Sequence, residues 1–208
     1  MEQLDIFDEN YNYIGTSSKK EVHQKGLWHQ TFDCLFIDSK KNTVYFQYKN
    51  QEHNAASSKN KIDISVGGHL LANEKISDGI REIKEEANLD VNYNNLYYLG
   101  IRKANKVINE NYIIREFIHL HIYDNSFDIY SLKSIDDEVL YYIEFNIDEL
   151  IDFLNNKTSI IKGNTPYGEK SFNIDNFIEG YLEDDRLYLN YLLLAKRIIN
   201  KEENVKWN

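Results

Sequence analysis

The sequence predicts an α/β sandwich with a mixed sheet, an N-terminal hairpin and a C-terminal helical extension. Apolar residues alternate with polar ones through most of residues 3–145, which is the period of half-buried strands. One stretch of helical spacing interrupts this pattern, and helical spacing prevails near the C-terminus. Strands followed by helices are typical of a sheet covered by helices. We therefore expect a first domain over residues 1–154 and a helical extension over 155–208, packed on that domain or on a partner subunit.

Composition narrows the classes of protein. The chain has 208 residues, of which 42% are hydrophobic, so it can bury a core without disulfides. Its one cysteine, Cys34, lies in an apolar strand pattern and is expected to be a small core residue. The net charge of −10 argues against nucleic-acid binding, because the phosphate backbone repels an acidic surface. Neither a signal peptide nor an apolar run of about 20 residues is present, so we expect a cytoplasmic protein with no membrane partner.

Polar turns separate the expected strands. Residues 3–15 are expected to form a hairpin around a polar turn. Strands over 30–37 and 43–49 flank a second polar turn, and the polar stretch 50–60 is expected to be a surface loop. The remaining expected strands are 62–66, 96–103, 113–123 and 138–145.

Helical spacing appears in four places. Ile76, Ile80, Ile83 and Ala87 form an apolar stripe, which predicts a helix over 76–87. The breakers Gly163, Pro166 and Gly168 divide the C-terminal part of the chain. The other expected helices are 147–154, 172–182 and 185–201.

The most informative segment is residues 67–89. Glu82, Glu85 and Glu86 stand at i, i+3 and i+4, so they share one face of the expected helix and repel one another. A hard divalent cation such as Mg²⁺ or Mn²⁺ relieves that repulsion, because it prefers carboxylate oxygen ligands. Such a triplet by itself is also typical of a solvated acidic face. A glycine pair and a further glutamate upstream of the helix favour the metal site.

This segment resembles the signature of the Nudix hydrolases, the MutT-like family. The family pattern is a glycine, five residues, a glutamate, seven residues, and then Arg-Glu-apolar-x-Glu-Glu-x-Gly-apolar. Gly68 and Glu74 keep the first spacing, and residues 81–86 keep the whole metal-binding core. Two features depart from the pattern: six residues rather than seven precede Arg81, and Asn88 replaces the final glycine. Asparagine tolerates the left-handed conformation that ends a helix, so the second change is mild.

The resemblance implies a Nudix-type α/β/α sandwich and a role for each matched residue. Glu82, Glu85 and Glu86 would hold Mg²⁺ or Mn²⁺, while Arg81 would orient them and pair with Glu74. The Gly67 or Gly68 carbonyl would add a ligand, and Gly67, Gly68 and His69 would form the phosphate loop. The general base would be Glu85 or Glu116.

A wider similarity, over about residues 3–150, is to the branch of the family related to isopentenyl-diphosphate isomerase. In that isomerase, metal-binding histidines occupy positions that resemble His23, His29 and His69, with an acid on a later strand. Its reactive cysteine would align with Gly67, which has no proton to give, so isomerisation is not expected. From the residues alone, the three histidines are also typical of turn, strand and loop positions. The segments that carry the similarity are 21–32 and 61–69.

Glu116 is a carboxylate of interest outside the glutamate helix. It belongs to an otherwise apolar row on one face of the strand 113–123. An acid on such a face is costly unless a cation or a hydrogen-bond donor meets it. We expect Glu116 to bind metal or activate water, to pair with a basic group such as Arg102, or to lie at an exposed strand end. His119 and His121 lie on the other face and are expected to be solvated or paired across strands.

Together these features predict a metal-dependent hydrolase of a nucleoside diphosphate linked to another moiety, with water attacking phosphorus. Two alternatives stay open: an isopentenyl-diphosphate isomerase-like enzyme, and a binding module on a Nudix scaffold that has lost catalysis. The expected partner is a small-molecule diphosphate. Relatives of this family often dimerise, so the resemblance also implies a homodimer.

Overall fold

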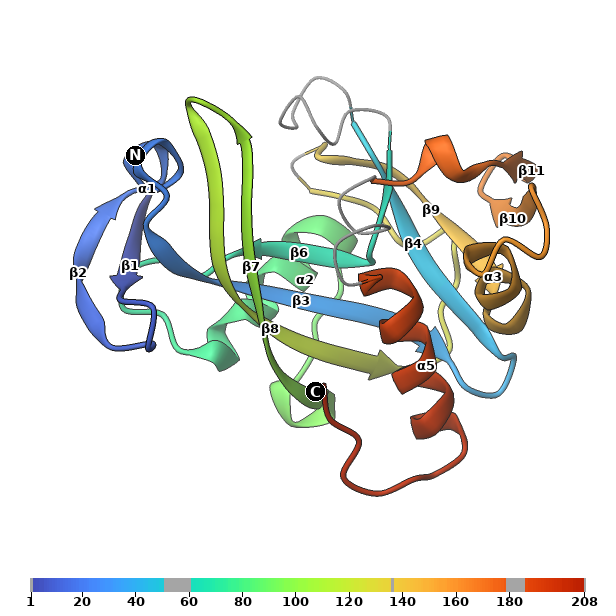
Figure 1. Cartoon of the computed structure of the whole chain (residues 1–208). Coiled ribbons are helices and arrows are strands. Elements are labelled where there is room, and N and C mark those ends of the chain that lie inside the picture. The colour runs from blue at the N-terminus through green and yellow to red at the C-terminus, as the bar shows by residue number, and fades with distance from the viewer. Residues whose placement is uncertain (1, 51–60, 136, 179–185, 208) are drawn as a thin grey trace.

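The computed structural model describes the chain except for residues 1, 51–60, 136, 179–185 and 208 (Figure 1). No helix in the described part is long and apolar enough to cross a membrane. The helices are α1 (Lys19–Lys25), α2 (Ile80–Ala87), α3 (Ile147–Leu154) and α5 (Leu187–Ile199), with short 3₁₀ helices at Ile76–Gly79, Tyr93–Asn95 and Ile174–Asn176. The strands are β1 (Gln3–Phe7), β2 (Tyr13–Ser18), β3 (Trp28–Asp38), β4 (Thr43–Lys49), β5 (Ile62–Asp63), β6 (Val66–His69), β7 (Tyr97–Asn109), β8 (Tyr112–Asp124), β9 (Val139–Asn146), β10 (Ile161–Thr165) and β11 (Gly168–Phe172).

One mixed sheet contains all of these strands, and β3 is its centre. Along one edge β3 pairs in turn with β1, β6 and β4, each antiparallel. Its other edge pairs with β8 in parallel from His29 to Ile37. The remaining described strand pairs are antiparallel, including the long β7–β8 hairpin. The expected mixed sheet is therefore confirmed.

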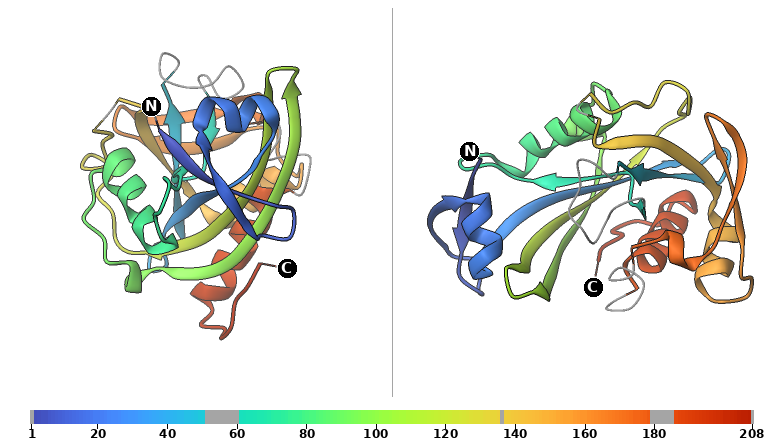
Figure 2. Two further views of the ribbon diagram at one scale, coloured as in Figure 1. Left: turned by 90° about the vertical axis from the view of Figure 1, so that its left-hand side faces the viewer. Right: turned by 90° about the horizontal axis from the view of Figure 1, so that it is seen from above.

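Helices cover both faces of the sheet. Phe32, Cys34 and Phe36 of β3 are fully buried in a cluster with Ile83 and Ala87 of α2. The alternate β3 residues pack in a second cluster with α3 and α5. Figure 2 shows α2 on one side of the sheet and α3 and α5 on the other. The α/β/α sandwich and the core position of Cys34 are as expected, because successive strand residues point to opposite faces.

The C-terminal segment packs on the same sheet. Tyr191 of α5 is fully buried, and its hydroxyl donates to the His121 carbonyl at 2.9 Å while accepting from the His121 amide at 3.0 Å. The helix expected over 172–182 is wrong for the described residues, because β11 runs to Phe172 and a 3₁₀ turn follows. Residues 179–182 lie outside the described part. Pro166 and Gly168 lie at the β10–β11 hairpin turn, whereas Gly163 lies within β10. The domain division after residue 154 stays a prediction.

A short helix, α1, was not expected from the sequence. Ser18 caps it by accepting from the Glu21 amide at 3.3 Å. Gly26 ends it at a φ of +61°, and a Cβ at this glycine would lie 2.7 Å from Ile113 of β8. Seven residues are too few for helical periodicity to be recognised, so only the capping serine and the glycine signalled this helix.

His119 and His121 are fully buried, so they are not solvated; of the two expected arrangements, pairing across strands is confirmed for His119, which meets Tyr98 of the neighbouring strand β7. The His119 ring nitrogens lie 3.0 Å from the Tyr11 hydroxyl and 3.2 Å from the Tyr98 hydroxyl. The His121 Nε2 lies 3.1 Å from the Tyr93 hydroxyl. Burial lowers the pKa of each histidine to about 4. The other two phenol groups, of Tyr11 and Tyr93, come from outside strands β7 and β8, and strand alternation alone does not reveal them.

The buried His119 makes stability depend on pH. A histidine with a lowered folded pKa contributes stability above its unfolded pKa of about 6.5, and this contribution is lost as the pH falls toward about 4. We expect His119→Gln to be less stable than the wild type at pH 7 but to lose less stability between pH 7 and pH 5. The gap in unfolding free energy, measured with urea, should narrow by about 1–2 kcal/mol. Parallel pH profiles for the two proteins would contradict this.

Candidate active site

The glutamate helix α2 lies directly against the glycine strand β6. The Gly67 amide donates to Glu86 Oε2 at 3.0 Å. Gly68 approaches Glu82 so closely that a Cβ at this position would lie 2.1–2.5 Å from the carboxyl atoms. Glycine is therefore required at 68 for this placement of Glu82. The helix ends at Asn88 with a φ of +54°, the left-handed conformation expected of an asparagine at this position.

Arg81 joins the expected glutamates into one network. Its Nε lies 3.0 Å from Glu74 Oε1, so the pair forms although the loop is one residue shorter than the family pattern. Its two terminal nitrogens lie 2.8 Å from Glu82 and 2.8 Å from Glu85. One of them also donates to the His69 carbonyl at 3.1 Å. Arg81 thus fixes the positions of three carboxylates and of the end of β6.

Glu82 and Glu86 are buried carboxylates that lack full charge compensation. Burial raises the pKa of Glu82 to about 7, with Arg81 opposing the shift. Burial likewise raises the pKa of Glu86 well above its usual range, with Lys49 opposing it. Glu85 differs, because its side chain is 39% exposed and pairs with Arg81. Two of the three predicted ligands, Glu82 and Glu86, therefore meet at the glycine strand. A hard divalent cation fits these oxygen donors and would offset the free-energy cost of burying their charge.

Lys49 and Asp63 belong to the same neighbourhood and were not singled out from the sequence. Their charged groups lie 3.4 Å apart, and both side chains are largely buried. Burial opposes the charge on Lys49, but Asp63 and Glu86 outweigh it and raise the lysine pKa. The signal that could have found them is a charged residue within the apolar strands 43–49 and 62–66.

A second constellation lies across β6 from the glutamates. Because Gly68 faces Glu82, the next residue, His69, points to the opposite face of the strand. There it meets His23 of α1 and His29 of β3, and the ligand nitrogens of the three rings lie within 4.8 Å of one another. Among the residues that the structure describes, this histidine trio is the one group of three or more potential metal-ligand side chains so close together.

The backbone orients two rings of the histidine trio. His29 Nδ1 lies 2.9 Å from the Leu27 carbonyl, and His23 Nδ1 lies 3.4 Å from the Ile113 carbonyl. A carbonyl oxygen only accepts, so each Nδ1 meets it as an N–H donor. A neutral ring carries a single N–H, so its Nε2 then keeps a free lone pair. The Nε2 atoms of His23 and His69 lie 3.1 Å apart, and His29 Nε2 is buried with no hydrogen-bond partner among the described residues.

The electrostatics of the trio keep its rings neutral. Burial lowers the pKa of His29 to about 4 and also lowers those of His23 and His69. Neutral, converging imidazole nitrogens are the donor set that transition metals prefer.

Glu116 lies beside the histidine trio and away from α2. Its Oε1 is 3.7 Å from His29 Nε2, and its side chain is 14% exposed, so it is not at an exposed strand end. Burial raises the pKa of Glu116 to about 7, with the charge of Arg102 opposing the shift. The expected site residues therefore divide into a carboxylate group on α2 and a histidine group that includes Glu116.

The fold and the site together are an α/β/α sandwich with an acidic helix packed against a glycine strand. No protein-family model matches the chain. It is 44% identical over 158 residues to an uncharacterised Nudix hydrolase of Clostridium acetobutylicum, covering 75% of each chain. It is 30% identical over 101 residues to a second such protein of a Nostoc species, covering 48% of this chain and 59% of the other. The chain belongs to the Nudix hydrolase family, whose members cleave diphosphate bonds.

Solved structures agree on the fold. A MutT/nudix family protein of Enterococcus faecalis superposes with a TM-score of 0.53 at 14% identity, covering 85% of this chain and 65% of the other. A Deinococcus radiodurans protein gives a TM-score of 0.53 at 15% identity, covering 74% of this chain and 90% of the other. The sandwich is therefore shared with proteins of very different sequence.

The close approach at Gly68 can be tested by adding one methyl group. In Gly68→Ala the new Cβ must displace the Glu82 carboxylate, and folding should suffer little because the obstructing atoms are the end of a flexible side chain. We expect the Glu82 pKa, measured by NMR titration, to fall from about 7 toward its ordinary value as the group reaches solvent. Gly67→Ala is the control, since its Cβ faces Asp33 instead. An unchanged Glu82 pKa in Gly68→Ala would contradict the packing.

Proposed function

We propose that the protein is a divalent-metal-dependent hydrolase that cleaves the diphosphate linkage of a nucleoside diphosphate joined to another moiety. The observation that carries this proposal is the pair of buried carboxylates, Glu82 and Glu86, held against the glycine strand. Both acids have raised pKa values, and in the described part of the chain the cations that act on them are Arg81 and Lys49, so they match a site for a hard metal ion. Membership of the Nudix hydrolases supports the same reaction class.

Each residue of the carboxylate group has a role in this proposal. Glu82 and Glu86 hold Mg²⁺ or Mn²⁺, which supplies Lewis-acid stabilisation of the charge on the reacting phosphate when it is bound. Arg81 positions Glu82 through a contact of 2.8 Å and is itself held by Glu74 and the His69 carbonyl, while the Gly67 amide holds Glu86. Glu85 is the better general base, because it is partly exposed on the same helix face. Gly67 and Gly68 are half-buried and have no side chains, so phosphate oxygens can approach their backbone closely.

The histidine trio provides a second cation position in the same proposal. Three imidazole nitrogens and the Glu116 oxygen form a mixed donor set that suits Zn²⁺ or Mn²⁺ better than Mg²⁺. The Nδ1 contacts with backbone carbonyls are the outer hydrogen bonds that hold metal-binding histidines in orientation. Glu116 is therefore assigned to this second position rather than to the general base.

Loss of one carboxylate should separate catalysis from folding. Glu86→Gln keeps the shape and a hydrogen-bond acceptor for the Gly67 amide but weakens an oxygen ligand. We expect turnover of a diphosphate substrate to fall about 10²-fold or more, since each ~1.4 kcal/mol of lost transition-state stabilisation is a factor of ten. The melting temperature should not fall, because a carboxylate that resists burial has been removed.

Lys84→Gln is the matched control for Glu86→Gln. Lys84 lies on the same helix and pairs with the exposed Asp90 at 2.9 Å, so its loss should leave turnover near that of the wild type. The measurement is phosphate release from a panel of nucleotide sugars, dinucleotides, coenzyme A and nucleoside triphosphates with Mg²⁺ or Mn²⁺. Near-wild-type turnover by Glu86→Gln would reduce the acidic helix to a solvated surface and overturn the proposal.

The second cation position has its own test. We expect the wild type to bind Zn²⁺ in calorimetry and His29→Gln to bind it at least about tenfold more weakly, because one of four ligands is lost. Glu82→Gln should keep the Zn²⁺ affinity of the wild type, since Glu82 lies across β6 from the trio. Equal Zn²⁺ affinity in His29→Gln and the wild type would rule out the histidine trio as a metal site.

A further inference from the structure

The strand β3 presents a row of polar side chains on the same face as the histidine trio. His29, Thr31 and Asp33 share this face, because they alternate along β3 with the residues that pack on α2 and the pairing of β3 with β8 is unbroken. Farther along the same face, Leu35 and Ile37 are fully buried in the apolar cluster with α3 and α5. The polar row therefore begins at the trio and ends at Asp33.

Thr31 carries a buried hydroxyl with an unused hydrogen-bonding capacity. The residue is 6% exposed, and its Oγ1 has no hydrogen-bond partner among the described residues. In the sheet it lies directly opposite His69 of β6. A buried hydroxyl in this condition costs folding free energy, so it points to a ligand that supplies the missing hydrogen bond.

Asp33 connects the polar row to the carboxylate group on α2. It lies opposite Gly67 of β6, and a Cβ at this glycine would lie 3.0 Å from Asp33 Oδ1, so the absent side chain leaves room for the carboxyl. The amide of the same glycine donates to Glu86 at 3.0 Å. Gly67 therefore borders both acids, and the polar row ends beside the place proposed for the reacting phosphate.

The surroundings of Asp33 favour hydrogen bonding over metal binding. The residue is 6% exposed, and within the described part of the chain no hydrogen bond reaches its carboxyl. Burial raises the pKa of Asp33 well above its usual range, with Asp63 and Glu116 adding to the shift and Arg102 and Lys49 opposing it. This environment favours the protonated carboxyl, which both donates and accepts a hydrogen bond.

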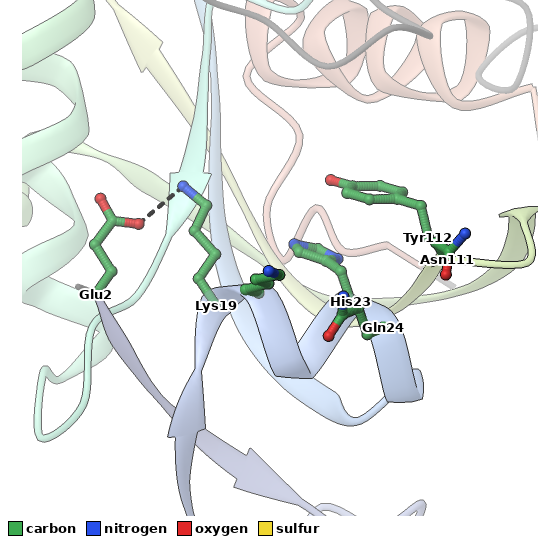
Figure 3. A pocket seen from close by; sticks show the side chains of 7 residues that line it. Glu2, Lys19, His23, Gln24, Asn111 and Tyr112 are labelled. Carbon is green, nitrogen blue, oxygen red and sulfur yellow. Dashed lines mark ion pairs between the residues drawn. The ribbon is translucent and has the colours of Figure 1, made fainter.

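The polar row is distinct from the pocket on the solvent side of the trio. That pocket, of about 450 Å³, lies beside α1 and is lined by His23. Figure 3 shows the His23 ring beside Tyr112, on which it stacks with centroids 4.4 Å apart. Neither Thr31 nor Asp33 lines this pocket, so the two residues form a separate, inner part of the face that carries the trio.

We propose that Thr31 and Asp33 bind hydroxyl groups of the moiety attached to the diphosphate, so that this moiety is a sugar or another polyol. The inference rests on the proposed hydrolase function and deepens it by naming the class of the moiety. Carboxyl and hydroxyl side chains are groups that pair with sugar hydroxyls. An apolar moiety would leave both buried groups unpaired, and a site built to bind a hydroxyl rejects an analogue that lacks it.

The probes are two matched pairs of sugar phosphates: ribose 5-phosphate with 2-deoxyribose 5-phosphate, and glucose 6-phosphate with 2-deoxyglucose 6-phosphate. Binding is measured by calorimetry with Mg²⁺ present. The wild type should bind the fully hydroxylated member of at least one pair about tenfold or more tightly than its deoxy partner. Asp33→Ala should reduce that preference to within about twofold, because both hydrogen-bonding oxygens are lost.

Two variants control for effects on folding and on charge. Asp33→Asn keeps the shape, one donor group and one acceptor, so it should restore most of the preference that Asp33→Ala loses. Asp152→Ala removes the same group from α3, where Asp152 is 49% exposed and pairs with Lys157. It should keep the preference of the wild type.

Thr31→Val separates ligand binding from folding. It removes the hydroxyl but keeps the shape, so the affinity for the preferred sugar phosphate should fall about threefold or more. The melting temperature should stay level or rise, because an unpaired buried polar atom has been removed. Unchanged affinity, or a lower melting temperature, would show that the Thr31 hydroxyl serves the fold rather than a ligand.

The outcomes separate this inference from the hydrolase proposal. Equal binding within both pairs, no binding of any sugar phosphate, or tighter binding of isopentenyl phosphate by the wild type overturns the assignment of the polar row. In that case the substrate screen still tests hydrolysis, through the effect of Glu86→Gln. If instead no substrate of the panel releases phosphate but the preference depends on Asp33, the hydrolase proposal fails and the hydroxyl-binding site stands.

Discussion

The close approach of α2 to β6 at Gly68 is the contact on which the arrangement of the site depends. It requires a residue with no Cβ, because the Glu82 carboxyl occupies the space that a side chain would fill. The same approach lets the Gly67 amide donate to Glu86. With both carboxylates held at the strand, the strand's alternation sends His69 to the opposite face. One backbone segment of three residues therefore positions two chemically different sets of ligands.

This arrangement costs folding free energy because it buries charged groups. Glu82, Glu86 and Glu116 all have raised pKa values because they are largely removed from water. Arg81, Lys49 and Arg102 offset part of that penalty. Because the compensation is only partial, these buried acids lower the stability of the fold, which is typical of sites that bind a cation. The surrounding core of aromatic and aliphatic residues on both faces of β3 supplies the stability that makes this tolerable.

The two faces of β6 carry different metal-ligand atoms, and this difference suits the two cation positions proposed above. Carboxylate oxygens on α2 suit the hard ion that reactions at phosphate employ, whereas the imidazole nitrogens suit a transition metal. Lys19 and Lys20 of α1 lie on the histidine side, beside His23. Ser18 caps α1, and Gly26 lets its end lie close to β8, so the helix that carries His23 is anchored to the central sheet.

The sequence by itself determined the class of fold, the glutamate helix and the family, because these depend on local spacing. Helical periodicity placed Glu82, Glu85 and Glu86 on one face, and strand alternation placed Cys34 in the core. Only the tertiary structure decided that Glu85 turns toward Arg81 and solvent, that His119 and His121 are buried against tyrosines, and that His23, His29 and His69 converge. It also ended strand β11 at Phe172 and placed a 3₁₀ turn over Ile174–Asn176, where a longer helix was expected. These features depend on contacts between residues tens of positions apart, and spacing along one chain carries no record of which distant segments will meet.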